Sequence, residues 1–198
     1  MEGLGRANDF ISEAVDALMG QRSTISDARK SVRDVAGLYA IYATAETWRQ
    51  LGLEEPSGPR PLYVGKAERS LQSRDLATHF SSGRTGQSTL RRTCAALLRD
   101  DRDCLFRGVP RNPAKPDKPS HFALAEAHDT TLTEWMNAKL TLAVWERPDN
   151  CTDLERVEIG VIRRLVPPLN IQNNALSPWI RYVRDARDLM AADVRVLM

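Results

Sequence analysis

Apolar residues recur every three or four positions in several segments of the chain, and this spacing predicts amphipathic helices. The pattern is clearest in TLRRTCAALLRD and TDLERVEIGVIRRLV, where charged residues fill the intervening positions. Ser, Thr or Asn stands before each start as a cap, and Gly or Pro follows several of the ends. We expect helices at 8–20, 70–80, 89–100, 152–166 and 177–192, and a short helix or a loop at 24–34.

Three short segments rich in β-branched and aromatic residues predict strands: GLYAIYA (37–43), PLYVGKA (61–67) and LTLAVWE (140–146). The first two are expected to pair across a long connection. Strands placed early with helices after them predict an α+β fold, with a small central three-stranded sheet, mixed or antiparallel, flanked by helices. We divide the chain into an N-terminal helical extension (1–35), a main domain (36–175) with a loop-rich, proline-rich insertion at about 101–136, and a C-terminal helix (176–198).

Composition narrows the class of protein only moderately. The 198 residues are 42% hydrophobic and 27% charged, which fits a globular domain with additions. Of the 28 basic residues 23 are Arg, whose forked guanidinium binds phosphate in a bidentate way. The three Cys residues have no metal-site spacing and fit a reducing compartment, and no apolar run approaches a membrane span. We therefore expect a cytoplasmic protein without a membrane partner.

Glu158 does not fit the apolar stripe of its predicted helix. Glu155 is explained by a capping box with Thr152, but the helical neighbours of Glu158 are Leu154, Val161 and Ile162. A carboxylate at the edge of a buried face needs a partner, because an unpaired buried charge is costly. That partner is either an arginine across the sheet or a divalent metal ion such as Mg²⁺, which takes few protein ligands.

The stretch from Lys66 to Arg99 has seven basic residues against two acids. Such a surplus is typical of a surface that neutralises DNA phosphates, although a solvated helix face gives the same pattern. By contrast, His121 and His128 lack the spacing of a zinc site and are read as surface residues. The candidates for DNA contacts are Lys66, Arg69, Arg84, Arg91 and Arg92.

The ordered set of motifs resembles the GIY-YIG nuclease superfamily. GLY at 37–39 stands where that family has its first triplet, and YVG at 63–65 followed by Lys66 stands for the second. Glu158 and Asn170, in PPLN, match the family's late Glu and its P-x-x-N ending. The resemblance covers about residues 36–173 without the insertion.

This resemblance implies hydrolysis of DNA phosphodiester bonds with one divalent metal ion, Mg²⁺ or Mn²⁺. Carried over by motif, Tyr39 and Tyr63 line the active site, Arg74 contacts the scissile phosphate and Glu158 binds the metal. His79 takes the place of the family's His or Tyr. Gly37, Gly65 and Asn170 support the site.

The spacing of Arg74 and His79 departs from the family, which separates these two residues by four positions. Five positions on an ideal α-helix would place them about 140° apart instead of about 40°. Either the helix is irregular or His79 points elsewhere, so the general base is Tyr39 or His79. Tyr39 would need a nearby cation, such as Lys66, to lose its proton at neutral pH.

Two other functions compete with the metal-dependent endonuclease. One is a catalytically silent DNA-binding module on the same fold, and the other is a protein-interaction domain whose arginines are only compositional. Within the nuclease class, a restriction-type, a repair and a mobile-element enzyme fit equally. Cutting both strands would need a homodimer or two successive nicks, and a restriction role would need a partner methyltransferase.

Overall fold

The computed structural model describes residues 2–114 and 118–197, and for residues 2–6 and 73–76 it describes the backbone alone. The α-helices are α1 (Glu2–Met19), α2 (Ile25–Ser31), α3 (Ala45–Gln50), α4 (Thr89–Leu97), α5 (Glu126–Lys139), α6 (Leu154–Leu165) and α7 (Ile180–Val196). The shorter helical segments are η1 (Gln72–His79), η2 (Thr85–Gln87) and η3 (Pro119–His121). The strands are β1 (Ser23–Thr24), β2 (Gly37–Ala43), β3 (Tyr63–Ala67) and β4 (Leu140–Glu146).

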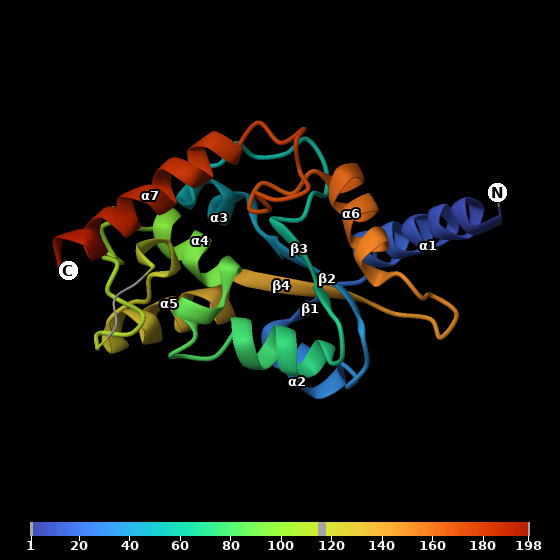
Figure 1. Cartoon of the computed structure of the whole chain (residues 1–198), viewed down its shortest axis with the longest axis horizontal. Helices are drawn as coiled ribbons and strands as arrows, with labels where there is room; N and C mark the ends of the chain where they lie inside the picture. The colour runs from blue at the N-terminus through green and yellow to red at the C-terminus, as the bar shows by residue number, and fades with distance from the viewer. Residues whose placement is uncertain (1, 115–117, 198) are drawn as a thin grey trace.

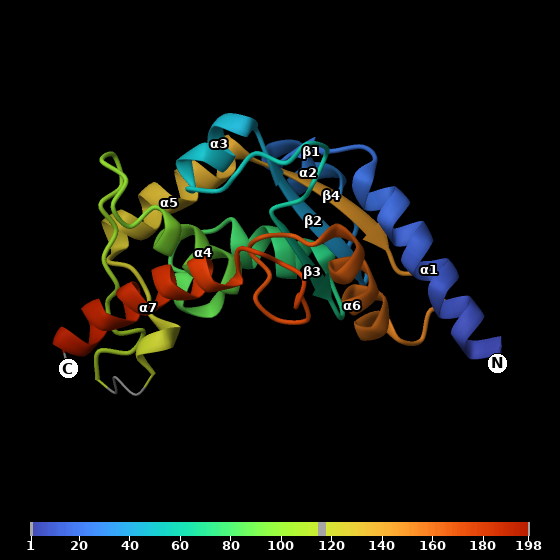
Figure 2. The same cartoon turned by 90° about the horizontal axis from the view of Figure 1, so that it is seen from above.

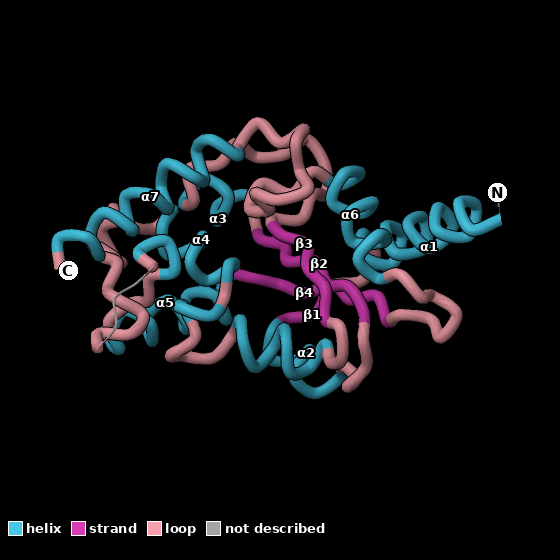
Figure 3. The backbone as a smooth tube through the Cα atoms, in the orientation of Figure 1, coloured by secondary structure: helices cyan, strands magenta, loops and turns pink. Residues whose placement is uncertain are grey.

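The strands form one antiparallel sheet in the order β1-β4-β2-β3, which confirms the predicted α+β fold (Figure 3). The expected pairing of β2 with β3 is present, with Tyr39 opposite Gly65. The sheet has four strands instead of three, because Ser23 and Thr24 add a short strand beside β4. Two residues are too few to show an alternating pattern in the sequence. In the order β1-β4-β2-β3, the strand β3 lies at one edge of the sheet, and its outer side faces the loops that follow α6.

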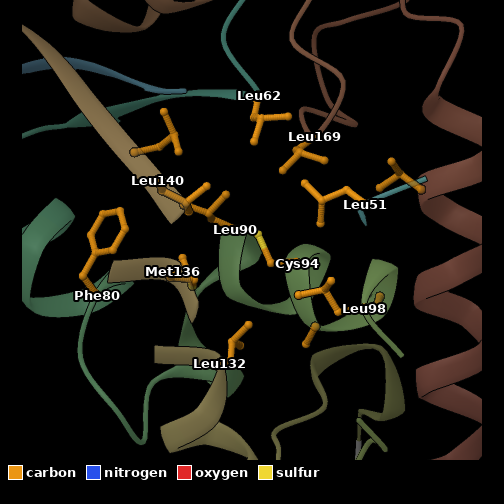
Figure 4. Close-up of a cluster of buried hydrophobic side chains, with 14 of the residues drawn as sticks. Leu51, Leu62, Phe80, Leu90, Cys94, Leu98, Leu132, Met136, Leu140 and Leu169 are labelled. Atoms are coloured by element: carbon orange, nitrogen blue, oxygen red, sulfur yellow. The ribbon is translucent and has the colours of Figure 1, made fainter. Parts of the chain in front are cut away.

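Side-chain alternation along β2 gives the sheet two separate cores. Tyr39 and Ile41 point into a large cluster against α4, α5 and α7, of which Figure 4 shows the part around Leu90 and Met136. Leu38 and the other residues of the opposite face point into a smaller cluster against α1 and α6. Figures 1 and 2 show these two groups of helices on either side of the sheet. The sheet therefore presents its edge strand β3 between two packed layers.

Several local predictions change in the structure. The connection after β2 contains the helix α3, capped by Thr44, which accepts a hydrogen bond from the N–H of Thr47. The second half of the predicted insertion is the helix α5. The expected capping box of Thr152 is wrong, because Asp153 caps α6 by accepting from the N–H of Arg156 at 2.9 Å. The cap lies one residue later than predicted, so the N–H that it satisfies is that of Arg156 and not that of Glu155.

The two termini lie at opposite ends of the molecule (Figure 1). The division into an extension, a main domain and a C-terminal helix stays a prediction. No helix among the described residues is long and apolar enough to cross a membrane.

Candidate functional site

An open pocket of about 730 Å³ lies along the edge strand β3. Tyr39 and Tyr63 line it from one face of the sheet, and Lys66 and Glu158 line it from the face that α6 covers. Asn170 completes the wall from the loop after α6. The structure thus brings together, from segments more than a hundred residues apart, five side chains that the sequence motifs singled out.

A chain of hydrogen bonds runs from this pocket into the protein through His79. The Tyr39 hydroxyl lies 2.6 Å from His79 Nε2, and His79 Nδ1 lies 2.7 Å from the Ser88 hydroxyl. All three side chains are buried, with His79 only 1% exposed. Ser88 also caps α4 by accepting from the N–H of Arg91 at 3.1 Å. The imidazole is therefore fixed at both nitrogens, with one of them on the tyrosine hydroxyl.

The irregular helix η1 explains the five-residue spacing between Arg74 and His79. Residues 72–79 form a π-helix, in which hydrogen bonds run from residue i to i+5. Positions five apart then lie about one turn apart along the helix, as positions four apart do in an α-helix. The extra residue thus restores the backbone alignment that the family obtains with a four-residue spacing. The side chain of Arg74 lies outside the described residues.

Both triplet glycines are required by close packing. A Cβ atom on Gly65 would collide with the hydroxyl and ring of Tyr39 directly opposite it, and would lie 2.9 Å from the ring of Tyr63. A Cβ atom on Gly37 would collide with the carbonyl oxygen of Trp145 on β4. Gly65 therefore gives the tyrosine of the first triplet room to lie flat across β3.

Asn170 completes the hydrogen bonding of the edge strand. Its Oδ1 accepts from the N–H of Val64 at 2.8 Å, and its Nδ2 donates to the carbonyl of Val64 at 2.7 Å. Next to this pair, the N–H of Leu169 donates to the carbonyl of Leu62 at 2.9 Å. An edge strand has unpaired backbone groups that must find partners when buried. The asparagine side chain thus replaces a neighbouring strand and fixes the loop against the pocket.

Lys66 lies among three carboxylates on the α6 side of the pocket. Its Nζ is 2.8 Å from Glu68, 3.8 Å from Glu155 and 3.9 Å from Glu158. Partial burial alone would lower the pKa of Lys66, but the hydrogen bond with Glu68 and the charges of Glu158, Glu68 and Glu155 together hold that pKa above its usual value. Lys66 therefore stays cationic and balances the acidic side of the site.

The donor set suits a hard divalent cation. The Glu158 side chain is 16% exposed and lines the pocket one turn after Glu155. Among the side chains that the structure describes, no group of three or more His, Cys, Asp or Glu could form a closed metal cage. Mg²⁺ does not require one, since it binds through one or two carboxylates and keeps water and phosphate as its other ligands.

The two adjacent arginines of α4 have different environments. Arg91 is fully buried, forms an ion pair with Asp129, and donates to the carbonyl of His79 at 2.9 Å. The expected DNA contact of Arg91 is therefore wrong, because its guanidinium is enclosed in the core, where it holds η1 and α5 together. Arg92, one residue later, lines the pocket.

The remaining basic candidates for DNA contacts also differ in whether they line the pocket. Lys66 and Arg69 line the pocket. Arg84 is exposed and donates to the side chain of Gln87 at 3.0 Å, and it does not line the pocket. Its contact with DNA stays a prediction.

Some site residues escaped the motif analysis. The position of Ser88 before the predicted helix at 89–100 indicates only a helix cap, although its hydroxyl also holds His79. His121 was read as a surface residue and Arg187 was not singled out, yet both line the pocket. These residues come from the insertion and from α7, which packs against α4 and η3. Their only signal in the sequence is a basic character that many other exposed residues share.

The fold is mixed, and basic and acidic side chains line a pocket at the edge of its small antiparallel sheet. A hydrogen-bonded Tyr–His pair opens into this pocket. Together these features define a catalytic domain of the nuclease type. The family model of the GIY-YIG catalytic domain matches residues 37–188, most of the chain. The chain therefore belongs to the GIY-YIG catalytic domain family. Comparison with curated proteins and with solved structures gave no match.

Proposed function

We propose that this protein is a metal-dependent endonuclease that hydrolyses DNA phosphodiester bonds in the pocket along β3. The observation that carries the proposal is the hydrogen-bonded series Tyr39–His79–Ser88, which opens into the same pocket as Glu158. A phenol backed by an imidazole can move a proton, and a carboxylate in the same pocket can hold a metal ion. Together they supply both requirements of phosphodiester hydrolysis at one place.

In this proposal Tyr39 is the general base, and His79 is the group that makes it basic. With Nδ1 protonated and donating to Ser88, Nε2 of His79 accepts the hydroxyl proton of Tyr39. As water attacks phosphorus, its proton passes to the Tyr39 oxygen while the tyrosine proton passes to His79. The new P–O bond forms, the bond to the leaving 3′ oxygen breaks, and that oxygen takes a proton from solvent. His79 then returns its proton to Tyr39, which releases one proton to solvent, so that both groups recover their starting state.

The charges around the pocket stabilise the phosphate as negative charge develops. Arg74 is assigned to the non-bridging oxygens by its place in the family motif, and Arg69 supplies a further cation at the pocket wall. Glu158 would hold Mg²⁺ or Mn²⁺, which when bound neutralises charge on the leaving oxygen. Lys66 keeps the neighbouring carboxylates from repelling the DNA strand.

The test is nicking of supercoiled plasmid in the presence of Mg²⁺ or Mn²⁺. Glu158→Gln should abolish nicking while DNA affinity, measured separately, is kept. Glu54→Gln makes the same change at an exposed position away from the pocket and should nick like the wild type. Plasmid left intact by the folded wild-type protein with both metals would refute the endonuclease, and binding without cleavage would favour the silent DNA-binding module.

Replacing His79 and Ser88 tests the assignment of the base. His79→Ala should remove most nicking, because it removes the imidazole that accepts the proton of Tyr39. Ser88→Ala should lower the rate less and should move the pH profile, since the imidazole keeps Tyr39 but loses the hydroxyl that fixes its tautomer and orientation. The variant also loses the cap of α4, so its free energy of unfolding is measured alongside. A pH profile identical to the wild type in Ser88→Ala would contradict this series. The cytoplasmic location and the possibility of a homodimer stay predictions.

A further inference from the structure

A cluster of arginines lies at the pocket, apart from the residues assigned to catalysis. Arg92 and Arg187 line the pocket with Tyr63, and Arg111 packs against Gly86, to which Arg92 donates. Arg92 comes from α4, Arg187 from α7 and Arg111 from the insertion. Burial and then the charges of Arg187 and Arg111 lower the pKa of Arg92, and Tyr63 acts electrostatically on both Arg92 and Arg187. Three separate segments therefore direct positive charge toward one region of the pocket.

The short turn η2 holds two members of this cluster. Arg92 is 6% exposed, and its Nη1 donates to the carbonyl of Gly86 at 2.8 Å. The aliphatic stem of Arg111 lies on the same glycine, since a Cβ atom on Gly86 would come 2.8 Å from Arg111 Cγ. The carbonyl of Gly86 thus accepts a hydrogen bond from Arg92, and the missing side chain of Gly86 leaves room for the stem of Arg111.

In the described part of the chain, none of the three guanidinium groups forms an ion pair with a carboxylate. The nearest acidic influence on Arg187 is the exposed Asp188. Arg92 Nε is buried without a hydrogen-bond partner. Such an arrangement is unfavourable for the free protein and is relieved when an anion binds.

The proton affinities of the cluster have the same cause. Burial, together with the charges of Arg187 and Arg111, lowers the pKa of Arg92 to about 10. Partial desolvation and the charges of Arg92, Lys118, Arg111 and Arg187 lower the pKa of His121 at the rim. Both shifts report a positive potential at this end of the pocket.

We propose that Arg92, Arg111 and Arg187 form a second phosphate-binding subsite that holds a DNA backbone phosphate next to the scissile one. The proposal deepens the proposed function and rests on it for the identity of the ligand. Guanidinium groups from three directions match the oxygens of a phosphodiester. Because the insertion and α7 supply two of the three arginines, these segments orient the strand while the triplet residues perform the chemistry.

The test measures duplex binding by fluorescence anisotropy in EDTA, so that no cleavage is required. The logarithm of the affinity falls with the logarithm of salt concentration, with a slope of about −0.9 for each phosphate neutralised. Arg187→Gln should make the slope less steep by up to about 0.9, the value for one phosphate. Arg195→Gln removes the same charge from an exposed position of α7 outside the pocket and should leave the slope unchanged. Equal slopes for the two variants would overturn the subsite.

Arg111→Gln is the second variant, because Arg111 is exposed and its replacement should not disturb folding. It should reduce the slope as Arg187→Gln does, and a wild-type slope in this folded variant would also overturn the subsite. The readout is independent of catalysis. Unchanged slopes with cleavage retained would refute the subsite alone, whereas a reduced slope in a protein that never nicks plasmid would refute the nuclease and keep the subsite.

His121 supplies a spectroscopic readout of the same subsite. When an anion neutralises the arginines, the pKa of His121, followed by NMR, should rise toward its ordinary value. We expect this rise with the duplex and expect it to be lost in Arg187→Gln. A rise with inorganic phosphate but none with the duplex would overturn the assignment to DNA, since the cluster would then bind only a free anion.

Discussion

Replacing Asn170 by alanine tests how the edge strand is held. The change removes both hydrogen bonds to Val64, so that the N–H and the carbonyl of one buried residue lose their partners together. The neighbouring bond from Leu169 to Leu62 is untouched, and the loop remains attached at that point. The perturbation is therefore local to the segment of β3 that carries Tyr63 and Gly65.

The magnitude follows from the two unsatisfied groups. Each buried donor or acceptor left without a partner costs about 1–3 kcal/mol. Water entering from the pocket will satisfy part of this loss, because Asn170 lines the pocket and is 7% exposed. We expect Asn170→Ala to lower the free energy of unfolding by about 2–4 kcal/mol.

Urea denaturation measures this change, and hydrogen exchange of the Val64 amide locates it. The exposed Asn150 is the matched control, and Asn150→Ala should change the free energy of unfolding by less than about 0.5 kcal/mol. Asn170→Asp keeps the acceptor for the Val64 N–H but sets a carboxylate against its carbonyl. The loss in the free energy of unfolding of Asn170→Asp should become smaller at low pH, where the protonated carboxyl group can donate to the Val64 carbonyl. A loss below about 1 kcal/mol in Asn170→Ala, with Val64 exchange unchanged, would refute this account of the edge.

Three further predictions concern packing, strain and ionisation. Gly65→Ala should push the buried ring of Tyr39 aside, which should lower the free energy of unfolding in urea by about 1–3 kcal/mol and the nicking rate by about 100-fold or more. Gly58→Ala is the control, because a Cβ atom there has open space, and it should match the wild type in both assays. Val166 ends α6 in the left-handed region at φ 46°, so Val166→Gly should raise the free energy of unfolding by about 1 kcal/mol, and a decrease would contradict strain at this residue. Burial raises the pKa of Cys94 from 9.0 to about 12, so its thiol should resist thiol reagents in the native state at pH 8. The stability that the neutral thiol contributes should be complete below pH 9 and should be lost as pH rises to 12. Cys94→Ala should flatten this alkaline decline in stability measured against pH, and an equally steep decline would assign it to other groups such as Tyr42.

Local periodicity along the chain is enough to predict part of the site. A two-residue alternation places Tyr63 and Gly65 on one face of a strand and Lys66 on the other, whatever the strand packs against. The helical period likewise marked Glu158 as a carboxylate on the margin of an apolar stripe. These features follow from backbone geometry within a single element, so the order of residues is enough to reveal them.

The packing of distant segments determines which side chains share the pocket, and the sequence does not reveal it. Arg91 and Arg92 are adjacent and chemically identical, and the packing of α5 and α7 against α4 makes one a core residue and the other a wall of the pocket. The position of His79 depends on a π-helix. Its bond with Ser88 depends on how η1 meets the start of α4. These outcomes arise from contacts between distant segments, whose free energies outweigh local preference and leave no periodic signal in the chain.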